Sequence, residues 1–363
     1  MGLVLAIMAA IWGIGHFMGA PLRQRAVLIG LVYLCVVLGH LVLPAENGLR
    51  AATGGQVEPW LALGVIALLG VIYRAAVTRL RARATATRPA DAAPTSGPFR
   101  AAELDRYARH IMLREIGGPG QRRLKSARVL VVGAGGLGSP ALLYLAASGV
   151  GTIGVIDDDV VEASNLQRQI IHSDGRIGMP KVHSAIEAMR ALNPFVDLRA
   201  YQRRLDDTSA AALIAEYDLV LDGTDNFDTR YLVNRVCARL GKPLIAAAIT
   251  QWEGQIGLYD PAQGGPCFEC VFPVRPAPGL APSCAEAGVV SPLPGVMGSM
   301  MAMEAVKAIT GAGQGLLGRL MIYDGLYAET RVIAVKPRHD CAVCGGLTTP
   351  HAQGDWTPDK RAP

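Results

Sequence analysis

The stretch LVVGAGGLGSPALLYLAASGVGTIGVIDDD, residues 130–159, decides how this chain folds. It reads as a buried strand, a glycine-rich turn, a helix, a second strand and an acidic tip. The turn has the spacing G-x-G-x-x-G with one additional glycine, and its members are Gly133, Gly135, Gly136 and Gly138. Glycines allow a tight turn and a close approach of phosphate oxygens to the N–H groups that open a helix. The stretch therefore predicts a nucleotide-binding turn.

The acidic tip supports this prediction. Asp157 follows the last glycine of the turn by 19 residues. A carboxylate at this position can accept hydrogen bonds from the hydroxyl groups of a ribose. The turn and this carboxylate together do not choose between NAD and ATP.

Strands and helices keep alternating on both sides of this stretch, over residues 100–346. Such alternation indicates a parallel sheet that is covered by helices on both faces. We therefore expect a Rossmann-like, doubly wound, mainly parallel α/β domain. Residues 347–363 read as a loose polar tail.

The chain opens with three apolar runs, at residues 2–20, 26–43 and 60–77. Each is near the length of about 20 residues that crosses a bilayer, although Arg74 falls inside the third, where its side chain can reach the interface. A cleaved signal peptide fits less well, because a basic n-region is missing and two further apolar runs follow. Residues 1–80 are therefore predicted to be a helical membrane segment, and three buried core helices are the alternative.

Basic residues predict the orientation of this segment. The first loop contains Arg23 and Arg25, whereas the second contains Arg50 beside Glu46 and Glu58. Five arginines follow from within the third run onward. The excess of positive charge on cytoplasmic loops then places the amino terminus outside and the rest of the chain in the cytoplasm. We expect a multi-pass protein of the inner (cytoplasmic) membrane.

Charge also separates the two parts of the chain. Residues 1–98 contain 8 Lys and Arg and 3 Asp and Glu, and the remainder contains 27 of each kind. The net charge of +5 therefore belongs to the membrane segment and its cytoplasmic edge. A neutral domain gives no electrostatic signature for nucleic acid, so no nucleic-acid partner is expected. Residues 81–99, rich in Arg, Ala, Thr and Pro, are predicted to be a flexible linker.

Charged residues around the glycine turn select the chemistry. Arg168 and Lys181 can neutralise the charge that develops on a pyrophosphate leaving group, and Arg109 offers a further guanidinium. Asp222 and Asp225 end a strand near the expected phosphates and provide the oxygen ligands that Mg²⁺ prefers. Each residue alone reads as a solvated charge, but together they favour nucleotidyl transfer from Mg·ATP. The alternative, an NAD-dependent oxidoreductase, has no use for the whole set.

Four of the seven cysteines form two CxxC pairs: Cys267, Cys270, Cys341 and Cys344. Two such pairs in a cytoplasmic domain predict one tetrahedral zinc site rather than disulfides. The pairs lie about 70 residues apart, so the zinc would fasten the end of the chain to the domain. Cys35 and Cys237 read as packing residues.

Several motifs, in this order and spacing, resemble one family: RYARHIMLREIG, GAGGLGSP, SNLQRQ, GMPK, DGTDN, PSCAEAGV and a late YDG. The chain is similar here to the MoeB/ThiF/HesA family, the bacterial relatives of ubiquitin-activating enzymes. The resemblance covers about residues 100–346 and excludes the apolar segment. It implies a Rossmann-like adenylation domain with a crossover loop. Such a domain uses ATP to adenylate the C-terminal glycine of a small ubiquitin-like sulfur carrier that ends in Gly-Gly, and releases pyrophosphate.

The resemblance also implies roles for individual residues. The glycines of the turn would hold phosphates, Asp157 would bind the ribose, and Asp225 would bind Mg²⁺. The further contacts to ATP would come from Asn165, Arg168, Lys181 and Asn226. Arg109 would act in the ATP site of the partner subunit, which implies a homodimer. The role of the zinc would be structural.

Cys284 lies in the Pro-, Gly- and Ala-rich stretch PAPGLAPSCAEAGVVSPLPG, residues 276–295. Some members of the family use a cysteine at this motif to form a covalent bond with the carrier, and others adenylate the carrier without it. The neighbouring sequence shows no base or cation to lower its pKa. A covalent role and a small loop residue therefore both stay open.

The resemblance as a whole favours the small subunit of molybdopterin synthase as the carrier, in molybdenum cofactor biosynthesis. The thiazole-pathway carrier of thiamine biosynthesis is the alternative, because the same motifs serve both. A membrane-tethered protein that docks a carrier without chemistry is a third interpretation. The sequence after Cys344 leaves no room for a sulfurtransferase domain, so we expect a separate sulfur donor.

Overall fold

The computed structural model describes residues 1–44, 46–86, 98–276 and 287–346. The chain divides into two compact units, Met1–Ala92 and Ala93–Pro363. The tail predicted at residues 347–363, most of the predicted linker and Cys284 lie outside the described residues.

The first unit is helical. Its elements are α1 (Gly2–Phe17), α2 (Leu22–Val42), α3 (Gly48–Ala52) and α4 (Glu58–Ala86). Trp60 is fully buried in this unit with Val4 and Met8. Its indole N–H donates to the carbonyl of Thr53 at 3.0 Å, and the hydroxyl of Tyr33 donates to the carbonyl of Trp60 at 2.7 Å. These contacts join α1, α2 and α4 into one unit.

The apolar helices differ from the expected spans at two places. The first helix ends at Phe17 rather than residue 20, because Gly19 adopts a left-handed φ of 68° and Pro21 follows. The last helix continues to Ala86, into the predicted linker. Residues 81–86 read RARATA, and Arg and Ala are strong helix formers, so this part of the linker prediction is wrong.

The second unit is built around a sheet. Within the described residues the strand order is β3-β2-β1-β4-β5-β6-β7-β8. The strands are β1 (Arg128–Val132), β2 (Thr152–Ile156), β3 (Asp197–Tyr201), β4 (Leu219–Asp222), β5 (Leu244–Ile249), β6 (Glu253–Tyr259), β7 (Arg319–Asp324) and β8 (Glu329–Ala334). Strands β1 to β5 pair in parallel, and β6, β7 and β8 extend the sheet antiparallel. The predicted α/β sheet with parallel strands is confirmed, and the antiparallel extension is additional to it.

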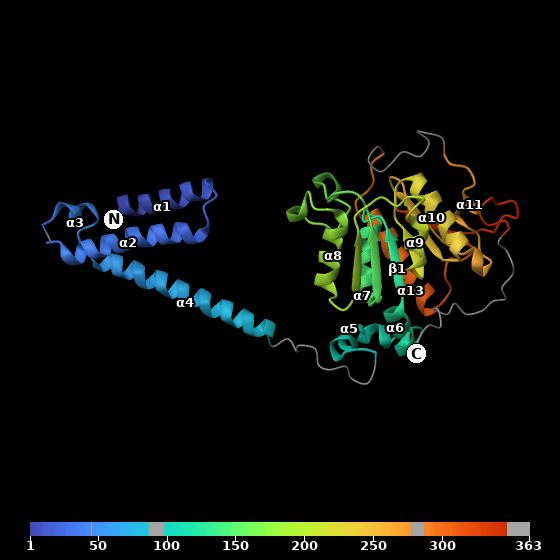
Figure 1. The fold of residues 1–363 in the computed structure, drawn as a ribbon, viewed down its shortest axis with the longest axis horizontal. Coiled ribbons are helices and arrows are strands. Elements are labelled where there is room, and N and C mark those ends of the chain that lie inside the picture. The colour runs from blue at the N-terminus through green and yellow to red at the C-terminus, as the bar shows by residue number, and fades with distance from the viewer. Residues whose placement is uncertain (45, 87–97, 277–286, 347–363) are drawn as a thin grey trace. The chain divides into compact units, whose positions relative to one another are not determined.

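Helices cover both faces of the parallel strands. The main helices are α7 (Gly138–Ser148), α8 (Lys181–Leu192), α9 (Ala210–Ala215), α10 (Phe227–Leu240) and α13 (Pro292–Thr310). Side chains of α7, α8 and α13 form one core cluster with Val129 and Val131 of β1, and those of α9 and α10 form a second cluster with Leu130 and Val132. Successive strand residues point to opposite faces, so β1 supplies both cores. Figure 1 shows α8 on one side of the strands and α9 and α10 on the other.

The described part of the second unit contains three further α-helices. Helices α5 (Ala101–Ile111) and α6 (Gly117–Ser126) precede β1, and α11 (Phe268–Val271) follows β6.

Strand β1 lies between β2 and β4, so the order of the strands reverses beside it. Ligands of open α/β sheets bind at such a switch point, outside the carboxyl ends of the strands.

Candidate active site

A cavity of about 560 Å³ opens at this switch point. Its walls include Val132, Ile156 and Ile249, which end β1, β2 and β5, and Gly223, which follows β4. This volume lies within the range of roughly 300–1,000 Å³ that is usual for pockets that bind small molecules. The cavity therefore has the size and the place in the fold of a nucleotide site.

The glycine turn forms one wall of the cavity. Gly133 has a φ of 93°, which favours glycine, and its N–H donates to the carbonyl of Ile156 at 2.9 Å. A Cβ on Gly138 would lie 2.0 Å from the carbonyl oxygen of Gly133. Only glycine therefore lets α7 begin this close to β1. Gly138 shapes the turn from behind, whereas Gly133, Gly135 and Gly136 line the cavity.

The turn offers free hydrogen-bond donors to the cavity. Neither the N–H of Gly135 nor that of Gly136 has an acceptor among the described residues. Both precede the first turn of α7, where N–H groups point out of the helix end and attract anions. Phosphate oxygens would satisfy these donors.

Asp157 leads from the end of β2 into the cavity wall. Its carboxylate accepts from the N–H of Ala134 at 2.7 Å and from the N–H of Asp159 at 2.9 Å. Burial raises the pKa of Asp157, and the hydrogen bond from Ala134 and the charge of Lys181 oppose that increase. The carboxylate is thereby fixed beside the glycine turn, where the ribose was expected.

Lys181 is the first residue of α8 and lines the cavity. Its side chain is only 6% exposed, and its Nζ lies 2.6 Å from a carboxylate oxygen of Asp159, which is 65% exposed. A buried ammonium needs a partner, and Asp159 provides it from 22 residues upstream. From sequence, Asp159 was predicted only to be solvated at the strand tip or to make local hydrogen bonds, and three consecutive aspartates were the only signal for its position in the site.

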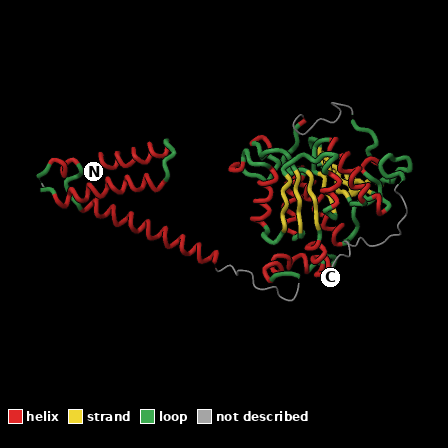
Figure 2. The backbone as a smooth tube through the Cα atoms, viewed as in Figure 1, coloured by secondary structure: helices red, strands yellow, loops and turns green. Residues whose placement is uncertain are grey.

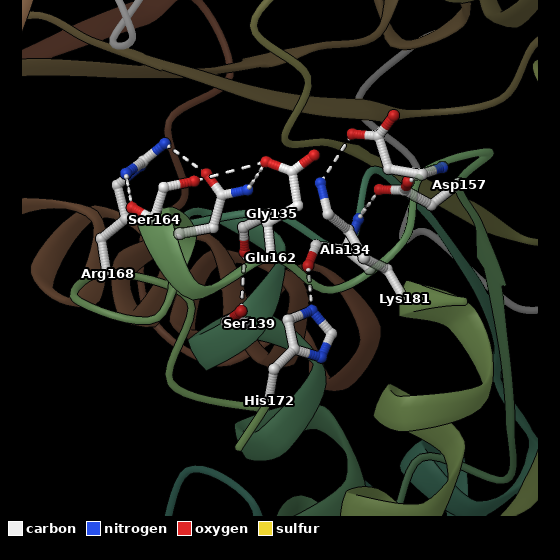
Figure 3. Close-up of polar contacts among 11 residues, drawn as sticks. Ala134, Gly135, Ser139, Asp157, Glu162, Ser164, Arg168, His172 and Lys181 are labelled. Atoms are coloured by element: carbon white, nitrogen blue, oxygen red, sulfur yellow. Dashed lines mark hydrogen bonds and ion pairs between the residues drawn. The ribbon is translucent and has the colours of Figure 1, made fainter. Parts of the chain in front are cut away.

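Arg168 also lines the cavity and is held by its own segment (Figure 3). Its guanidinium donates to the side-chain oxygen of Asn165 at 2.8 Å and to the carbonyl of Ser164 at 3.4 Å. The amide of Asn165 in turn donates to Glu162 at 3.3 Å. Asn165, predicted to contact phosphate, is not among the cavity-lining residues, and its observed contact is to Arg168.

Asp222, which ends β4, and Asp225, three positions later, lie in different environments. Asp222 is fully buried, accepts from the N–H and hydroxyl of Thr224 at 2.9 and 2.6 Å, and lies 3.6 Å from the guanidinium of Arg230. Its second carboxylate oxygen, Oδ2, has no hydrogen bond among the described residues, and Asp222 is not among the residues that line the cavity, so its role toward Mg²⁺ stays a prediction. Asp225 is exposed in the cavity and has no hydrogen bond or ion pair among the described residues. Its oxygens are free for a cation such as Mg²⁺, which prefers oxygen ligands.

Asn226 lines the cavity beside Asp225 and caps α10. Its side-chain oxygen accepts from the N–H of Thr229 at 2.8 Å, which is the usual bond of an Asn at a helix N-cap. The cap uses the side-chain oxygen of Asn226, so its side-chain NH₂ group can donate a hydrogen bond to a ligand.

Three cavity residues were missed by the sequence prediction. The side-chain oxygen of Gln169 is buried, lies in the cavity wall and has no hydrogen-bond partner among the described residues. A buried polar atom without a partner is costly, so it fits a ligand that donates a hydrogen bond. Arg203 and Arg204, which follow β3, add exposed positive charge to the wall. Their position depends on the sheet order, which their local sequence does not encode.

Arg109 is exposed on α5 and is not among the residues that line the cavity. A role in the ATP site of the same chain is therefore not supported by this structure. The implied role in the site of a partner subunit stays a prediction.

The four paired cysteines converge in the second unit. Their Sγ atoms all lie within 4.8 Å of one another, with separations of 3.8 Å (Cys267 and Cys270), 3.6 Å (Cys267 and Cys341) and 3.3 Å (Cys270 and Cys344). Zn–S bonds of about 2.3 Å in a tetrahedron place sulfur atoms about 3.8 Å apart. The N–H of Arg338 points to the sulfur of Cys270 at 3.3 Å, a contact that supports a thiolate. The cluster therefore fits a zinc ion.

The fold and the cavity define a nucleotide-binding α/β protein in which cations face a glycine turn. The model of the ThiF family matches residues 107–343. The chain belongs to the ThiF family.

Curated relatives agree with this membership. A sulfur carrier protein adenylyltransferase from Thermus thermophilus is 48% identical over 258 residues, which cover 70% of this chain and 95% of that protein. The SAMP-activating enzyme E1 of Haloferax volcanii is 48% identical over 245 residues, 68% of this chain and 90% of the relative. The probable adenylyltransferase/sulfurtransferase MoeZ of Mycobacterium tuberculosis is 48% identical over 237 residues, 64% of this chain and 60% of the relative.

A solved structure supports the fold. The crystal structure of E. coli MccB with AMPCPP and MccA has a TM-score of 0.59 and 25% sequence identity, and it covers 67% of this chain and 74% of that chain. The predicted enzyme class, an adenylyltransferase of the ThiF family, is confirmed.

Proposed function

We propose that this chain uses Mg·ATP to adenylate the C-terminal glycine of a small ubiquitin-like sulfur carrier. The observation that carries this proposal is the convergence of free N–H donors of Gly135 and Gly136 with Arg168 and Lys181 on one cavity. The relative from Thermus thermophilus, named a sulfur carrier protein adenylyltransferase, supports the choice of substrate. The alternative of an NAD-dependent oxidoreductase has no support among the named relatives.

The proposed reaction is an attack by the carrier's carboxylate oxygen on the α-phosphorus of ATP. A new P–O bond forms, the bond to the oxygen that bridges to the β-phosphate breaks, and pyrophosphate leaves with the electron pair. The glycine-turn N–H groups, Arg168 and Lys181 are proposed to orient the phosphates and to stabilise the negative charge on the leaving group. A bound Mg²⁺ would supply further positive charge between phosphate oxygens. Asp225 is the free carboxylate that we propose to hold it, and Asp157 is proposed to fix the ribose.

Carrier-dependent isotope exchange tests the proposed function and selects the pathway. The purified chain is incubated with Mg·ATP, labelled pyrophosphate and one carrier ending in Gly-Gly, and the label that enters ATP is measured. We expect exchange with the small subunit of molybdopterin synthase and much less with the thiazole-pathway carrier or without a carrier. Exchange with the thiazole-pathway carrier alone would transfer the proposal to thiamine biosynthesis. Absence of exchange with every carrier would leave a docking protein and refute the proposed chemistry.

Two partners complete the proposal. We propose a homodimer in which Arg109 of one subunit serves the ATP site of the other, since Arg109 is exposed and is not among the residues that line the cavity at the switch point. We also propose a separate sulfur donor, because the Thermus thermophilus relative, 95% of which is covered by the match, is named as an adenylyltransferase alone. A covalent role of Cys284 with the carrier stays part of the proposal as an option that the exchange reaction does not need.

We propose that the first unit anchors the enzyme in the inner (cytoplasmic) membrane, with the second unit in the cytoplasm. Two described helices, Arg23–Val42 and Glu58–Arg79, are long and apolar enough to cross a membrane, by length and composition alone. Large apolar side chains on them face outward, for example Val27 at 61% and Ile66 at 67% exposure. Contiguous exposed apolar surface of this kind suits lipid better than water. The first helix has 16 residues, about 24 Å at 1.5 Å per residue, and would need a locally thinner bilayer.

Deletion of residues 1–90 tests the anchor. We expect the full chain to sediment with membranes and to require detergent, and the shortened chain to remain in the soluble fraction with carrier-dependent exchange within about twofold of the full chain. The reason is that only 5% of the Thermus thermophilus relative lies outside its match to this chain, so that relative has no room for a comparable first unit. A full-length chain that is soluble without detergent would contradict the membrane proposal. A folded but inactive shortened chain would show that the first unit takes part in the reaction.

A further inference from the structure

A buried histidine contacts both the glycine turn and helix α8. Figure 3 shows its contact with Ala134 of the turn. His172 is 7% exposed, and its Nε2 lies 2.9 Å from the carbonyl oxygen of Ala134. Its Nδ1 lies 2.9 Å from the hydroxyl oxygen of Ser184 in α8. One side chain therefore spans the space between the turn and the helix that begins with Lys181.

The partners of His172 fix its protonation. A carbonyl oxygen only accepts hydrogen bonds, so Nε2 carries the proton and donates it to Ala134. In the neutral ring Nδ1 then accepts from the hydroxyl of Ser184. Burial lowers the pKa of His172, the bond to Ala134 opposes that shift, and the charges of Lys181 and Arg176 add to it. At neutral pH the ring is uncharged, and both of its nitrogens make hydrogen bonds.

The bond to Ala134 sets the direction of a donor that faces the cavity. In a planar trans peptide the C=O and the following N–H point in opposite directions. The carbonyl that His172 holds belongs to the same peptide as the N–H of Gly135, which has no acceptor among the described residues. The preceding peptide is held as well, because the N–H of Ala134 donates to Asp157 at 2.7 Å. Asp157 and His172 thus hydrogen-bond the N–H and the carbonyl of Ala134, respectively, and fix both peptides that flank this residue.

We propose that His172 is a positioning residue for the nucleotide: through the Ala134–Gly135 peptide it aims the N–H of Gly135 at a phosphate of ATP. Through Ser184 it also keeps the turn in register with Lys181, three positions earlier on α8. His172 itself touches neither ATP nor carrier in this role. The inference rests on the proposed function for the identity of the nucleotide.

Two substitutions separate the donor from the bulk of the ring. His172→Phe keeps a planar ring and removes the donor, whereas His172→Gln can present an amide N–H to the carbonyl of Ala134. We expect His172→Phe to raise the Kd for Mg·ATP, measured without carrier by calorimetry, by about 10-fold, since it leaves a buried carbonyl without its donor. The KM for the carrier in the exchange reaction should stay unchanged. The Kd of His172→Gln for Mg·ATP should lie within about threefold of the value for the original chain.

Asn193→Leu is the matched control. Asn193 is also fully buried, and its amide donates to a backbone carbonyl of α7, that of Ala146, at 2.6 Å, and to the hydroxyl of Tyr107 at 2.8 Å. Asn193 therefore contacts the C-terminal end of α7, which is the end away from the glycine turn. Asn193→Leu is expected to lower the melting temperature at least as much as His172→Phe and to leave the Kd for Mg·ATP unchanged below that temperature.

Several results would overturn the inference. The first is an unchanged Kd for Mg·ATP in folded His172→Phe. The second is a rise in this Kd in Asn193→Leu as large as that in His172→Phe. The third is a Kd in folded His172→Gln that is as high as that of His172→Phe. The two proposals fail in different ways. An original chain that binds Mg·ATP but exchanges no label refutes the proposed function and leaves His172 to be judged by the binding measurements. An active original chain with a normal His172→Phe variant refutes only the role of His172.

Discussion

Substitution of Lys181 by alanine is expected to lower carrier-dependent pyrophosphate exchange by at least about 100-fold, the range found when one stabilising donor is removed from an active site. Two effects add together. The phosphates lose a cation, and Asp159 loses the ammonium that lies 2.6 Å from its carboxylate. An unpaired carboxylate then remains beside the phosphates and repels them. The measurement is the rate of label transfer at saturating Mg·ATP and carrier.

Lys307→Ala is the control for this substitution. Lys307 lies on α13, also pairs with a carboxylate, that of Glu304, and is not among the cavity-lining residues. The folded variant should keep exchange within about twofold of the original chain, because Lys307 does not line the cavity. Its melting temperature should fall, because the buried carboxylate of Glu304 loses its cation. Equal losses in both variants would indicate unfolding rather than chemistry, and full exchange by Lys181→Ala would refute the assigned role.

Mixing two inactive variants extends the test to the proposed dimer. If Arg109 serves the partner's site, then a dimer of one Arg109→Ala subunit and one Lys181→Ala subunit contains one intact site. Random mixing of equal amounts makes about half of the two-fold symmetric dimers mixed, and each mixed dimer has one intact site out of two. The mixture should therefore recover about one quarter of the original activity per site. No recovery after verified subunit exchange would contradict the role of Arg109 in the partner's site.

If the four cysteines bind zinc, as we propose, then substitution of Cys344 by serine is expected to abolish zinc binding and to unfold the second unit. Zinc binding contributes roughly 10–16 kcal/mol to the folding of small zinc domains, which is similar in size to the total stability of about 5–15 kcal/mol of a typical domain. Cys344 is fully buried with the other three cysteines, so water cannot replace it as a ligand without disruption. We expect about one zinc ion per original chain and almost none in the variant, by elemental analysis.

Cys237→Ala is the matched substitution outside the cluster. Cys237 is buried in α10 and packs in the core beneath the sheet. Its loss should cost about 1 kcal/mol, as for other small core changes, and leave the zinc content unchanged. An original chain that is free of zinc and a Cys344→Ser variant that melts at the same temperature would together refute the metal site.

The parts of this molecule that were predicted from sequence are those with a local cause. The G-x-G-x-x-G spacing, the strand before it and the helix after it lie within a short stretch, and each glycine has a steric reason. Gly133 needs a left-handed φ of 93°, and Gly138 leaves no space for a Cβ. The two CxxC pairs likewise converge as their spacing predicted.

The parts that were missed depend on contacts between distant segments. Asp159 meets Lys181 only because the end of β2 and the start of α8 lie at the same edge of the sheet, and His172 reaches Ala134 across 38 positions of sequence. Asp222 and Asp225 stand in one motif, and the sequence gives no reason why one is buried against Arg230 and the other exposed. The antiparallel strands β6 to β8 follow from pairing choices that hydrophobic pattern alone does not make.

The ion pair between Lys181 and Asp159 has a consequence for which anions can enter. Without nucleotide the ammonium is already satisfied, so a small ion such as orthophosphate gains little by displacing Asp159. A triphosphate brings several negative charges at once and also meets the turn's N–H groups, and it can outcompete the resident carboxylate. We therefore expect the pocket to bind polyvalent anions more tightly than simple ones such as orthophosphate.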